Sequence, residues 1–363
     1  MEKYNPGIGI SAGAYLCKWS ELSPHVQNNP IHFNPGDKVN VFINFECILR
    51  NLSLHRTLIS SLAYYKKEVV IEMESAILNV MAHYKAYFKK EKCIPKVYFY
   101  YTDLKSEDSQ QMEIYNKYYR SYYKNKYLQN PDFKLMGETL VDIIIPEIEL
   151  ITSYIPDCYF IKSSMFDGSI IPQIISSMPE YAGYKNVVIS GDIFDTLYLF
   201  NLNFMVLYIK RRYQYFTLAS QIDSVVQSIV KNESPFDLTI FNSELYFRLL
   251  LAIKGSKIRN IRSAKGFGYG KFMKLLEDGI KNDVVLMNFE SIDSIIQLFP
   301  EKYRNDIRNA FICTSIETQY ALINESDIEN IRAQIKDKFD IKSVESLNNK
   351  RFLDFPINLQ MLL

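Results

Sequence analysis

The sequence predicts an α/β fold, in which a mainly parallel sheet is flanked by helices and followed by a helical region. Two observations lead to this prediction. Short runs dense in β-branched and aromatic residues alternate with segments of helical spacing, as they do in chains that build parallel sheets. From about Ser234 onward the pattern is predominantly helical.

The expected elements follow in chain order. Residues 1–37 are rich in Gly, Pro, Asn and Ser, and predict an irregular arm. Strands are predicted at 39–45, 96–101 and 185–190, and helical spacing runs from Leu52 to about Lys90. Residues 109–127 are polar and Tyr-rich, and predict one or two helices. Residues 142–151 form a short apolar segment, and residues 168–178 predict a helix that Pro172 begins or interrupts. The predicted domains are the arm at 1–37, the α/β domain at 38–233 and the helical region at 234–363.

Composition limits the class of protein. A chain of 363 residues can bury a core without disulfide staples. The net charge of +1 provides no overall field for a polyanion, so any contact with nucleic acid must come from local patches. The five Cys are scattered and the four His stand singly, which predicts reduced thiols and no zinc site. The 27 Tyr suit protein interfaces, so other protein subunits are expected partners.

Nothing in the sequence predicts a membrane partner. The N-terminus lacks the basic-then-apolar pattern of a signal peptide, and no run approaches the roughly 18 apolar residues that a membrane span needs. We therefore expect a soluble protein in the cytoplasm, or in the host cytoplasm or virion if the protein is viral.

The most informative pattern is a glycine-rich turn between two helical segments. It reads Gly255-Ser-Lys-Ile-Arg-Asn-Ile-Arg-Ser-Ala-Lys-Gly-Phe-Gly-Tyr-Gly-Lys-Phe-Met-Lys-Leu-Leu276. Glycines let the main chain approach a phosphate closely, and the following helix offers amides at its positive end. The residues predicted to contact a DNA backbone are Arg262, Lys265, Gly266, Gly268, Gly270, Lys271 and Lys274. A second interpretation, which stays open, is a turn needed only by the fold, with a solvated basic face.

This segment closely resembles the helix–turn–helix of the flap endonuclease / 5′-to-3′ exonuclease (PIN-like) family. The pattern of that family is Gly-Asp-x-x-Asp-Asn-Ile-x-Gly-x-x-Gly-Ile-Gly, followed by a helix that ends in Leu-Leu. The residues that stand in register with it without a gap are Asn260, Ile261, Gly266, Phe267, Gly268 and Leu275-Leu276. Its two metal-binding Asp positions are Ser256 and Arg259 in this chain. A second segment, Val187-Val-Ile-Ser-Gly-Asp192, resembles the family's strand that ends in Ser-Gly-Asp-x-Asp.

The resemblance implies a site where carboxylates at the ends of parallel strands hold two divalent metals that activate water. In this sequence Asn44 stands where the first strand should end in Asp, and Arg259 brings a cation to a ligand position. The remaining candidates are Asp103, Asp167, Asp192 and, after one inserted residue, Asp195. Aspartates at such positions also cap helices and close strand ends. We expect a degenerate acidic site, no cofactor, and Mg²⁺ only if some activity remains.

Three functions are compatible with these patterns. We favour a catalytically inactive flap-endonuclease-like protein that serves as a structural or interaction component, of a phage virion or a replication assembly. The alternatives are a non-catalytic protein that binds DNA structures through the basic turn, and a divergent metal-dependent 5′ nuclease.

Overall fold

The structure is a computed structural model that describes residues 33–53, 56–103, 131–164, 166–190, 195, 204–210, 213–218, 292–312 and 323–336, with shorter stretches between 248 and 278. It contains a six-stranded sheet of order β3-β2-β1-β4-β5-β6. The first five strands in this order pair in parallel, and β6 is antiparallel to β5. The mainly parallel sheet predicted from the sequence is therefore confirmed.

The strand bounds are β1 Lys38–Asn44, β2 Ile94–Thr102, β3 Cys158–Ser163, β4 Lys185–Ser190, β5 Phe204–Lys210 and β6 Tyr213–Leu218. Six consecutive residues of β1 are buried, because this strand lies in the middle of the sheet with helices on both faces. The predicted strands at 39–45, 96–101 and 185–190 correspond to β1, β2 and β4. The strands β3, β5 and β6 were not predicted from the sequence.

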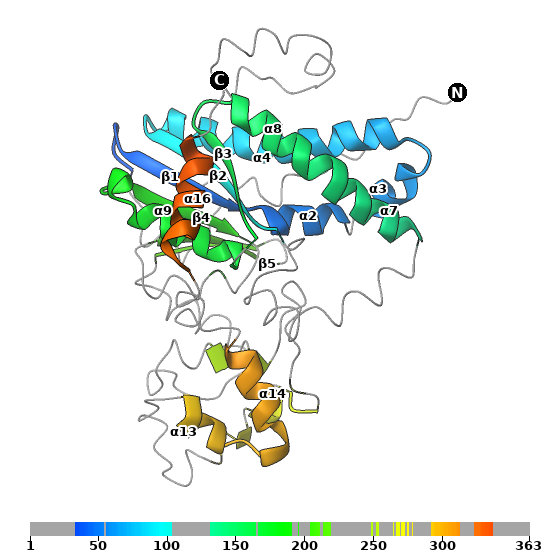
Figure 1. Ribbon diagram of the computed structural model, residues 1–363, viewed down its shortest axis with the longest axis vertical. Helices are drawn as coiled ribbons and strands as arrows, with labels where there is room; N and C mark the ends of the chain where they lie inside the picture. Colours follow the sequence, from blue (N-terminus) through cyan, green and yellow to red (C-terminus); the bar gives the residue numbers. More distant parts are fainter. Residues whose placement is uncertain are drawn as a thin grey trace.

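One face of the sheet carries the main apolar core. The side chains of Val39, Val41 and Ile43 enter a cluster formed with helices α2 (Phe45–Ser53), α3 (Arg56–Leu62), α4 (Lys66–Lys90), α7 (Pro131–Thr139) and α8 (Ile145–Tyr154). The 25-residue α4 crosses this face together with α8 (Figure 1). Because side chains alternate along a strand, Asn40, Phe42 and Asn44 point to the opposite face.

The opposite face is more polar and is covered by α9 (Ile171–Ser177) and α16 (Glu325–Lys336) (Figure 1). The ring of Tyr98 stacks between those of Phe42 and Tyr159, at centroid distances of 5.0 and 4.8 Å. Beside this stack, Asn40 Nδ2 donates to Asn186 Oδ1 at 2.9 Å. Polar side chains on this face are therefore satisfied by one another, and Asn44 is the last of them along β1.

Several predicted elements change their bounds in the structure. The single helical segment expected from Leu52 to Lys90 is three helices, α2, α3 and α4. The short apolar stretch at 142–151 lies in a π-helical turn, η3 (Leu140–Ile144), and in α8. The helix predicted at 168–178 is a 3₁₀ turn, η4 (Gly168–Ile170), followed by α9, and Pro172 stands in the first turn of α9 as expected for proline. The predicted arm to residue 32 and the segment 109–127 lie outside the described residues.

The chain beyond residue 234 contributes α13 (Ile292–Gln297), α14 (Glu301–Ile312) and α16. In Figure 1, α13 and α14 lie away from the sheet, whereas α16 returns to it. Gln334 of α16 accepts from Lys162 N at 2.9 Å and donates to Lys162 O at 3.0 Å, so its amide pairs with the free edge of β3. The predicted boundary near residue 234 stays a prediction, but α16 packs with the α/β part of the chain.

Candidate functional site

The order of the parallel strands marks one point of the sheet as a place for a site. The chain passes from β1 outward to β2 and β3, and then returns to the other side of β1 as β4. In open parallel sheets a crevice forms where the strand order reverses, outside the carboxyl ends of the two central strands. Here those ends are Asn44 of β1 and Ser190 of β4.

A buried network around Asp195 occupies this point. Asn44 Nδ2 donates to Asp195 Oδ2 at 2.7 Å and lies 3.4 Å from Ser190 Oγ. The hydroxyl of Tyr100, on β2, donates to the same Asp195 oxygen at 2.8 Å. The side chains of Asn44 and Asp195 are each only 3% exposed. Two neutral donors therefore serve this carboxylate away from water, and bonds to a charged group contribute about 1.5–3 kcal/mol each.

The other end of the Asn44 amide has a structural task. Its Oδ1 accepts a hydrogen bond from the backbone N–H of Cys47 at 3.1 Å, and Cys47 is the third residue of α2. Asn44 is therefore both the last residue of β1 and the N-cap of the next helix. This capping also explains why Phe45, predicted to continue the strand, begins a helix instead. The amide nitrogen faces Asp195, and the oxygen faces away from it.

Glu46, two residues after Asn44, does not lie beside it in the buried network. The side chains of residues i and i+2 share one face of a strand, but β1 ends at Asn44 and Glu46 belongs to α2. In the first turn of α2, Glu46 Oε1 accepts from Thr102 N at 3.1 Å, at the carboxyl end of β2. This hydrogen bond joins α2 to β2.

Asp167 caps a helix. Its Oδ1 accepts from Ser169 N at 2.9 Å, the bond by which an Asp N-cap serves the turn that follows it. The neighbouring Gly168 donates from its amide to Thr102 Oγ1 at 2.9 Å. A Cβ at Gly168 would lie 2.7 Å from the carbonyl carbon of Tyr101, so this position must be glycine. Asp167 is held against the end of β2 by its own turn.

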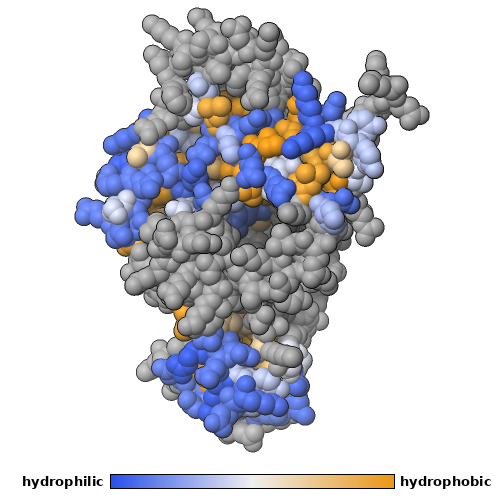
Figure 2. Space-filling model, turned by 45° about the vertical axis from the view of Figure 1, so that its right-hand side comes forward, coloured by the Kyte–Doolittle hydropathy of each residue, from blue (hydrophilic) through white to orange (hydrophobic). Residues whose placement is uncertain are grey.

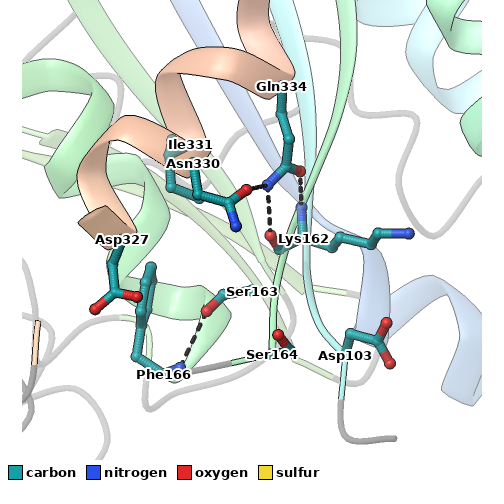
Figure 3. A pocket seen from close by; sticks show the side chains of 9 residues that line it. All are labelled: Asp103, Lys162, Ser163, Ser164, Phe166, Asp327, Asn330, Ile331 and Gln334. Carbon is teal, nitrogen blue, oxygen red and sulfur yellow. Dashed lines mark hydrogen bonds between the residues drawn. The ribbon is translucent and has the colours of Figure 1, made fainter. Parts of the chain in front are cut away.

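Asp103 is one of the residues that line a small pocket beside β3 (Figure 3). The amide of Asp103 donates to Ser163 O at 2.7 Å, which extends the pairing of β2 with β3 by one residue. The cavity has a volume of about 100 Å³. Its walls are Asp103, Lys162, Ser163, Ser164, Phe166, Asp327, Asn330, Ile331 and Gln334.

The second carboxylate that lines this pocket, that of Asp327, caps the helix α16. Asp327 and Asn324 exchange hydrogen bonds, each backbone amide donating to the other side chain at 3.0 Å. This reciprocal pair is a capping box at the start of α16. Lys162 Nζ pairs with Glu149 at 2.8 Å. The pocket is a polar seam between α16 and the ends of β2 and β3.

The described residues do not fit a pair of divalent metals. Within that part of the chain, no three or more His, Cys, Asp or Glu side chains gather closely enough to hold a metal ion. Mg²⁺ requires hard oxygen ligands in near-octahedral geometry, but Asn44 presents a nitrogen to Asp195. Of the sequence candidates, the structure brings Asn44 and Asp195 together and places Asp103 and Asp167 in other contacts. Asp192, Ser256 and Arg259 lie outside the described residues.

The glycine-rich turn is the second candidate site. Gly266 has a φ of +82°, the left-handed backbone that glycine adopts freely, and Phe267 N donates to Ala264 O at 3.0 Å to close the turn. Lys271 Nζ donates to Gly266 O at 2.6 Å. Among the predicted DNA contacts, Gly266, Gly268, Gly270, Lys271 and Lys274 are exposed. Arg262 and Lys265 lie outside the described residues.

Sequence reasoning missed two residues that lie beside this turn. Tyr303 OH donates to Gly266 O at 3.4 Å, and Lys302 Nζ lies 4.8 Å from the centre of the Tyr303 ring. Both belong to the first turn of α14, more than 30 residues further along the chain. No spacing signal in the sequence joins them to the turn, because only the packing of α14 brings them there.

Comparisons with known proteins identify the fold. No protein-family model matches the chain, and no curated protein matches it significantly. Among solved structures, it is similar to a bacteriophage T5 flap endonuclease complex with DNA and metal ions, at 13% identity and a TM-score of 0.51, covering 82% of this chain and 98% of that one. It is equally similar to the bacteriophage T5 5′-exonuclease with bound zinc, at 12% identity and a TM-score of 0.52, with the same coverage.

These likenesses concern the fold, since the identities are low. Among the described residues, no helix has both the length and the apolar character required to cross a bilayer. The parallel sheet, its flanking helices and the similarity to the two solved structures agree with the resemblance carried by Gly266, Gly268 and the strand at 187–190. The chain has a flap-endonuclease-like fold.

Proposed function

We propose that this chain is a flap-endonuclease-like protein that does not hydrolyse phosphodiesters and serves as a structural or interaction component. The observation that carries the proposal is the 2.7 Å hydrogen bond from Asn44 Nδ2 to Asp195 Oδ2 at the switch point of the sheet. A site for two-metal hydrolysis needs several anionic oxygens converging on the ions. Here a neutral donor faces the carboxylate instead.

Electrostatics favours this interpretation. Two carboxylates that face each other in a buried site repel unless a cation or a proton lies between them. Replacing one of them by an amide removes the repulsion and supplies a hydrogen bond, so the site is stable with no ion. Tyr100 adds a second donor to the same oxygen.

The proposed role is to bind other protein subunits, in a phage virion or a replication assembly. The 27 Tyr of the chain support it, since tyrosine provides rigid contact area with a polar tip. The similar solved structures include proteins of bacteriophage T5, which agrees with a phage setting.

A cleavage assay tests the proposal. The full chain is incubated with an end-labelled 5′-flap duplex in Mg²⁺ and, separately, in Mn²⁺, and products are resolved on a denaturing gel. We expect no product above the protein-free control. Metal-dependent cleavage that is abolished in Asp195→Asn, but kept in Asp132→Asn, would overturn it. Asp132 is an exposed residue in the first turn of α7, so the control makes the same chemical change away from the site.

A second candidate function is non-catalytic binding of DNA structures. The observation that favours it is the exposed turn with Lys271 and Lys274 beside open glycines. Contacts of this kind read the phosphate backbone and weaken steeply with salt. Fluorescence anisotropy with a labelled flap duplex measures it: binding at about 50 mM salt that falls sharply at about 200 mM supports it. Unchanged affinity in Lys271→Glu would remove the turn from the interface.

A further inference from the structure

The turn and the first residues of α14 form one packed unit. The Phe267 ring lies 5.3 Å from Phe299 and 5.0 Å from Tyr303, centre to centre. The ring of Phe272 stacks on Phe299 from the other side, 6.1 Å away at an interplanar angle of 11°. Phe267, Phe272 and Phe299 are each at most 2% exposed. An aromatic core therefore fixes the position of α14 relative to the turn.

Two ammonium groups gather on the surface of this unit. Lys271 Nζ and Lys302 Nζ lie 5.8 and 4.8 Å from the centre of the Tyr303 ring. A lysine ammonium has three donors, and the bond from Lys271 to Gly266 O uses one of them. The hydrogen bond from Lys302 and the positive charges of both lysines lower the pKa of the Tyr303 phenol. The surface at Tyr303 is therefore electropositive in a chain whose net charge is only +1.

Neither the backbone conformation nor the packing of the described residues requires glycine at two positions near these lysines. Gly268 and Gly270 are exposed, and neither has the positive φ found at Gly266. A Cβ added at either position would meet nothing within 4 Å. Their bare backbone is thus not required by the turn or by packing among the described residues. Glycine also occurs where a ligand approaches the main chain closely, and this is the explanation that is left for Gly268 and Gly270.

From these observations we infer that α14 completes the DNA-contacting surface of the turn, with Lys302 binding a backbone phosphate that approaches over Gly268 and Gly270, while the Tyr303 hydroxyl, which donates to Gly266 O, holds α14 against the turn. This inference rests on the second candidate function above and names its residues. The ligand is a phosphodiester of a nucleic-acid strand, because the surface offers two ammonium groups together with exposed main chain.

The helical part of the surface suits this ligand. The described surface of the part that carries α13 and α14 is largely hydrophilic in Figure 2, which favours a charged ligand over an apolar one. Phosphate oxygens accept from ammonium groups, phenols and backbone amides without regard to base sequence. We therefore expect binding that depends on strand geometry and on salt rather than on sequence.

Charge reversal at Lys302 is the first arm of the test. Anisotropy titrations with a labelled 5′-flap duplex compare the wild type with Lys302→Glu at several salt concentrations. We expect affinity about tenfold or more weaker, and a salt dependence whose slope falls by about one unit for each phosphate that the variant no longer neutralises. Lys67→Glu is the matched control, since Lys67 is an exposed lysine of α4 on the α/β part of the chain.

Substitution of an open glycine is the second arm. Gly268→Val adds bulk where a Cβ meets no atom of the described residues, so its melting temperature should stay close to that of the wild type. We expect its DNA affinity to fall at least about fivefold, because the branched side chain keeps the phosphate away from the main chain. An unchanged affinity in both Gly268→Val and Lys302→Glu overturns the inference.

Failure of the inference about α14 can be distinguished from failure of the DNA-binding candidate. Suppose that the wild type binds DNA, that Lys271→Glu weakens binding, and that Lys302→Glu behaves like Lys67→Glu. The turn then binds DNA without α14, and only the inference about α14 fails. If the wild type does not bind at low salt, the DNA-binding candidate fails as well, whereas the proposed non-catalytic role is unaffected.

Discussion

Asn44 occupies the last position of β1 and uses both ends of its amide. The oxygen caps α2 through Cys47 N, and the nitrogen donates to Asp195. An aspartate in its place would keep the cap, because a carboxylate oxygen also accepts from an amide. It would lose the bond to Asp195 and set two carboxylates against each other. The choice of amide over acid at this residue therefore decides whether Asp195 faces a hydrogen-bond donor or a second carboxylate.

Substituting Asn44→Asp tests this residue directly. The Oδ atoms would stand about 2.7 Å apart, the distance of the present hydrogen bond, in a site that is almost fully buried. We expect the free energy of unfolding at pH 7.5 to fall by roughly 2–4 kcal/mol, as when a buried charge loses its partner. Mn²⁺ should raise the melting temperature of the variant and leave that of the wild type unchanged.

The pH dependence of the same variant has a definite sign. Mutual repulsion raises the pKa of one carboxyl in the folded state above its unfolded value of about 4. The folded protein then binds more protons than the unfolded one, so the stability lost at pH 7.5 is recovered as pH falls toward 5. Asn40→Asp, on the same face of β1, is the control. It should also destabilise the fold but show no response to Mn²⁺, and an equal response in both variants would contradict the pairing with Asp195.

Gly168 gives a second test at this scale. A Cβ there would lie 2.7 Å from the Tyr101 carbonyl carbon and 2.8 Å from its oxygen, both rigid backbone atoms. Gly168→Ala should lower the free energy of unfolding by about 2–4 kcal/mol, since the turn must separate from β2. At Gly137, inside α7, a Cβ meets nothing within 4 Å. Gly137→Ala should be neutral or stabilise by up to about 1 kcal/mol in the same denaturant titration. Equal losses in the two variants would contradict the close approach.

Single residues also show how far sequence reasoning reaches. The position of Asn44 at a strand end followed from the apolar run before it. Its hydrogen bond with Asp195 could not be predicted, because 151 residues separate the two and an inserted residue displaces Asp195 from the family's pattern. For Asp167 the helix-capping alternative describes the hydrogen bond in the structure. The pairing of Tyr303 with the turn depends on aromatic packing that leaves no spacing signal.

At the scale of elements, polar contacts join α16 to the edge strand and to a neighbouring turn. The Gln334 amide forms two hydrogen bonds with the backbone of Lys162 on the edge strand β3, and Arg332 pairs at 3.4 Å with Glu180 in the 3₁₀ turn Pro179–Tyr181. Of the residues of α16 that the structure describes as buried, Asp327 and Ile331, only Ile331 is apolar. Free strand edges invite pairing with other chains, and a covering helix blocks this. The position of α16 thus protects β3.

The Gln334 hydrogen bonds can be tested by hydrogen exchange. Gln334→Ala removes both bonds to Lys162, at about 1 kcal/mol each, so the Lys162 amide should exchange roughly 30-fold faster under native conditions. Gln297→Ala, at an exposed position of α13, is the control and should leave this amide unchanged. The melting temperature should move little in either variant. An unaltered exchange rate at Lys162 in Gln334→Ala would show that α16 does not hold this edge.

The elements that sequence reasoning found and missed differ in their patterns. The strands β1, β2 and β4 are short apolar runs flanked by polar or turn residues, and such runs are recognisable. The strand β3 follows the apolar helix α8 after only Ile155, Pro156 and Asp157, so its start is hidden. The residues of β5 are also apolar, but periodicity alone does not distinguish a short buried strand from a helical segment. Pairing with β4 is what makes them a strand.

At the scale of the whole molecule, the described residues form two separate candidate sites. One is the switch point of the sheet, where Asn44 and Asp195 form a buried pair. The other is the basic unit made by the turn and α14, which lies away from the sheet (Figure 1). Because the two sites share no described residue, a substitution at one of them should leave the chemistry of the other unchanged.

Titration of Mn²⁺ into the wild-type protein, followed by electron paramagnetic resonance, tests the central claim most directly. Bound Mn²⁺ loses the sharp six-line spectrum of the free ion, so the signal counts free metal. If the Asn44–Asp195 hydrogen bond replaces the ion, the free signal should equal that of buffer alone at protein and metal concentrations of about 100 μM. Stoichiometric loss of the signal, restored by Asp195→Asn, would show that this site still binds a divalent metal and would contradict the claim.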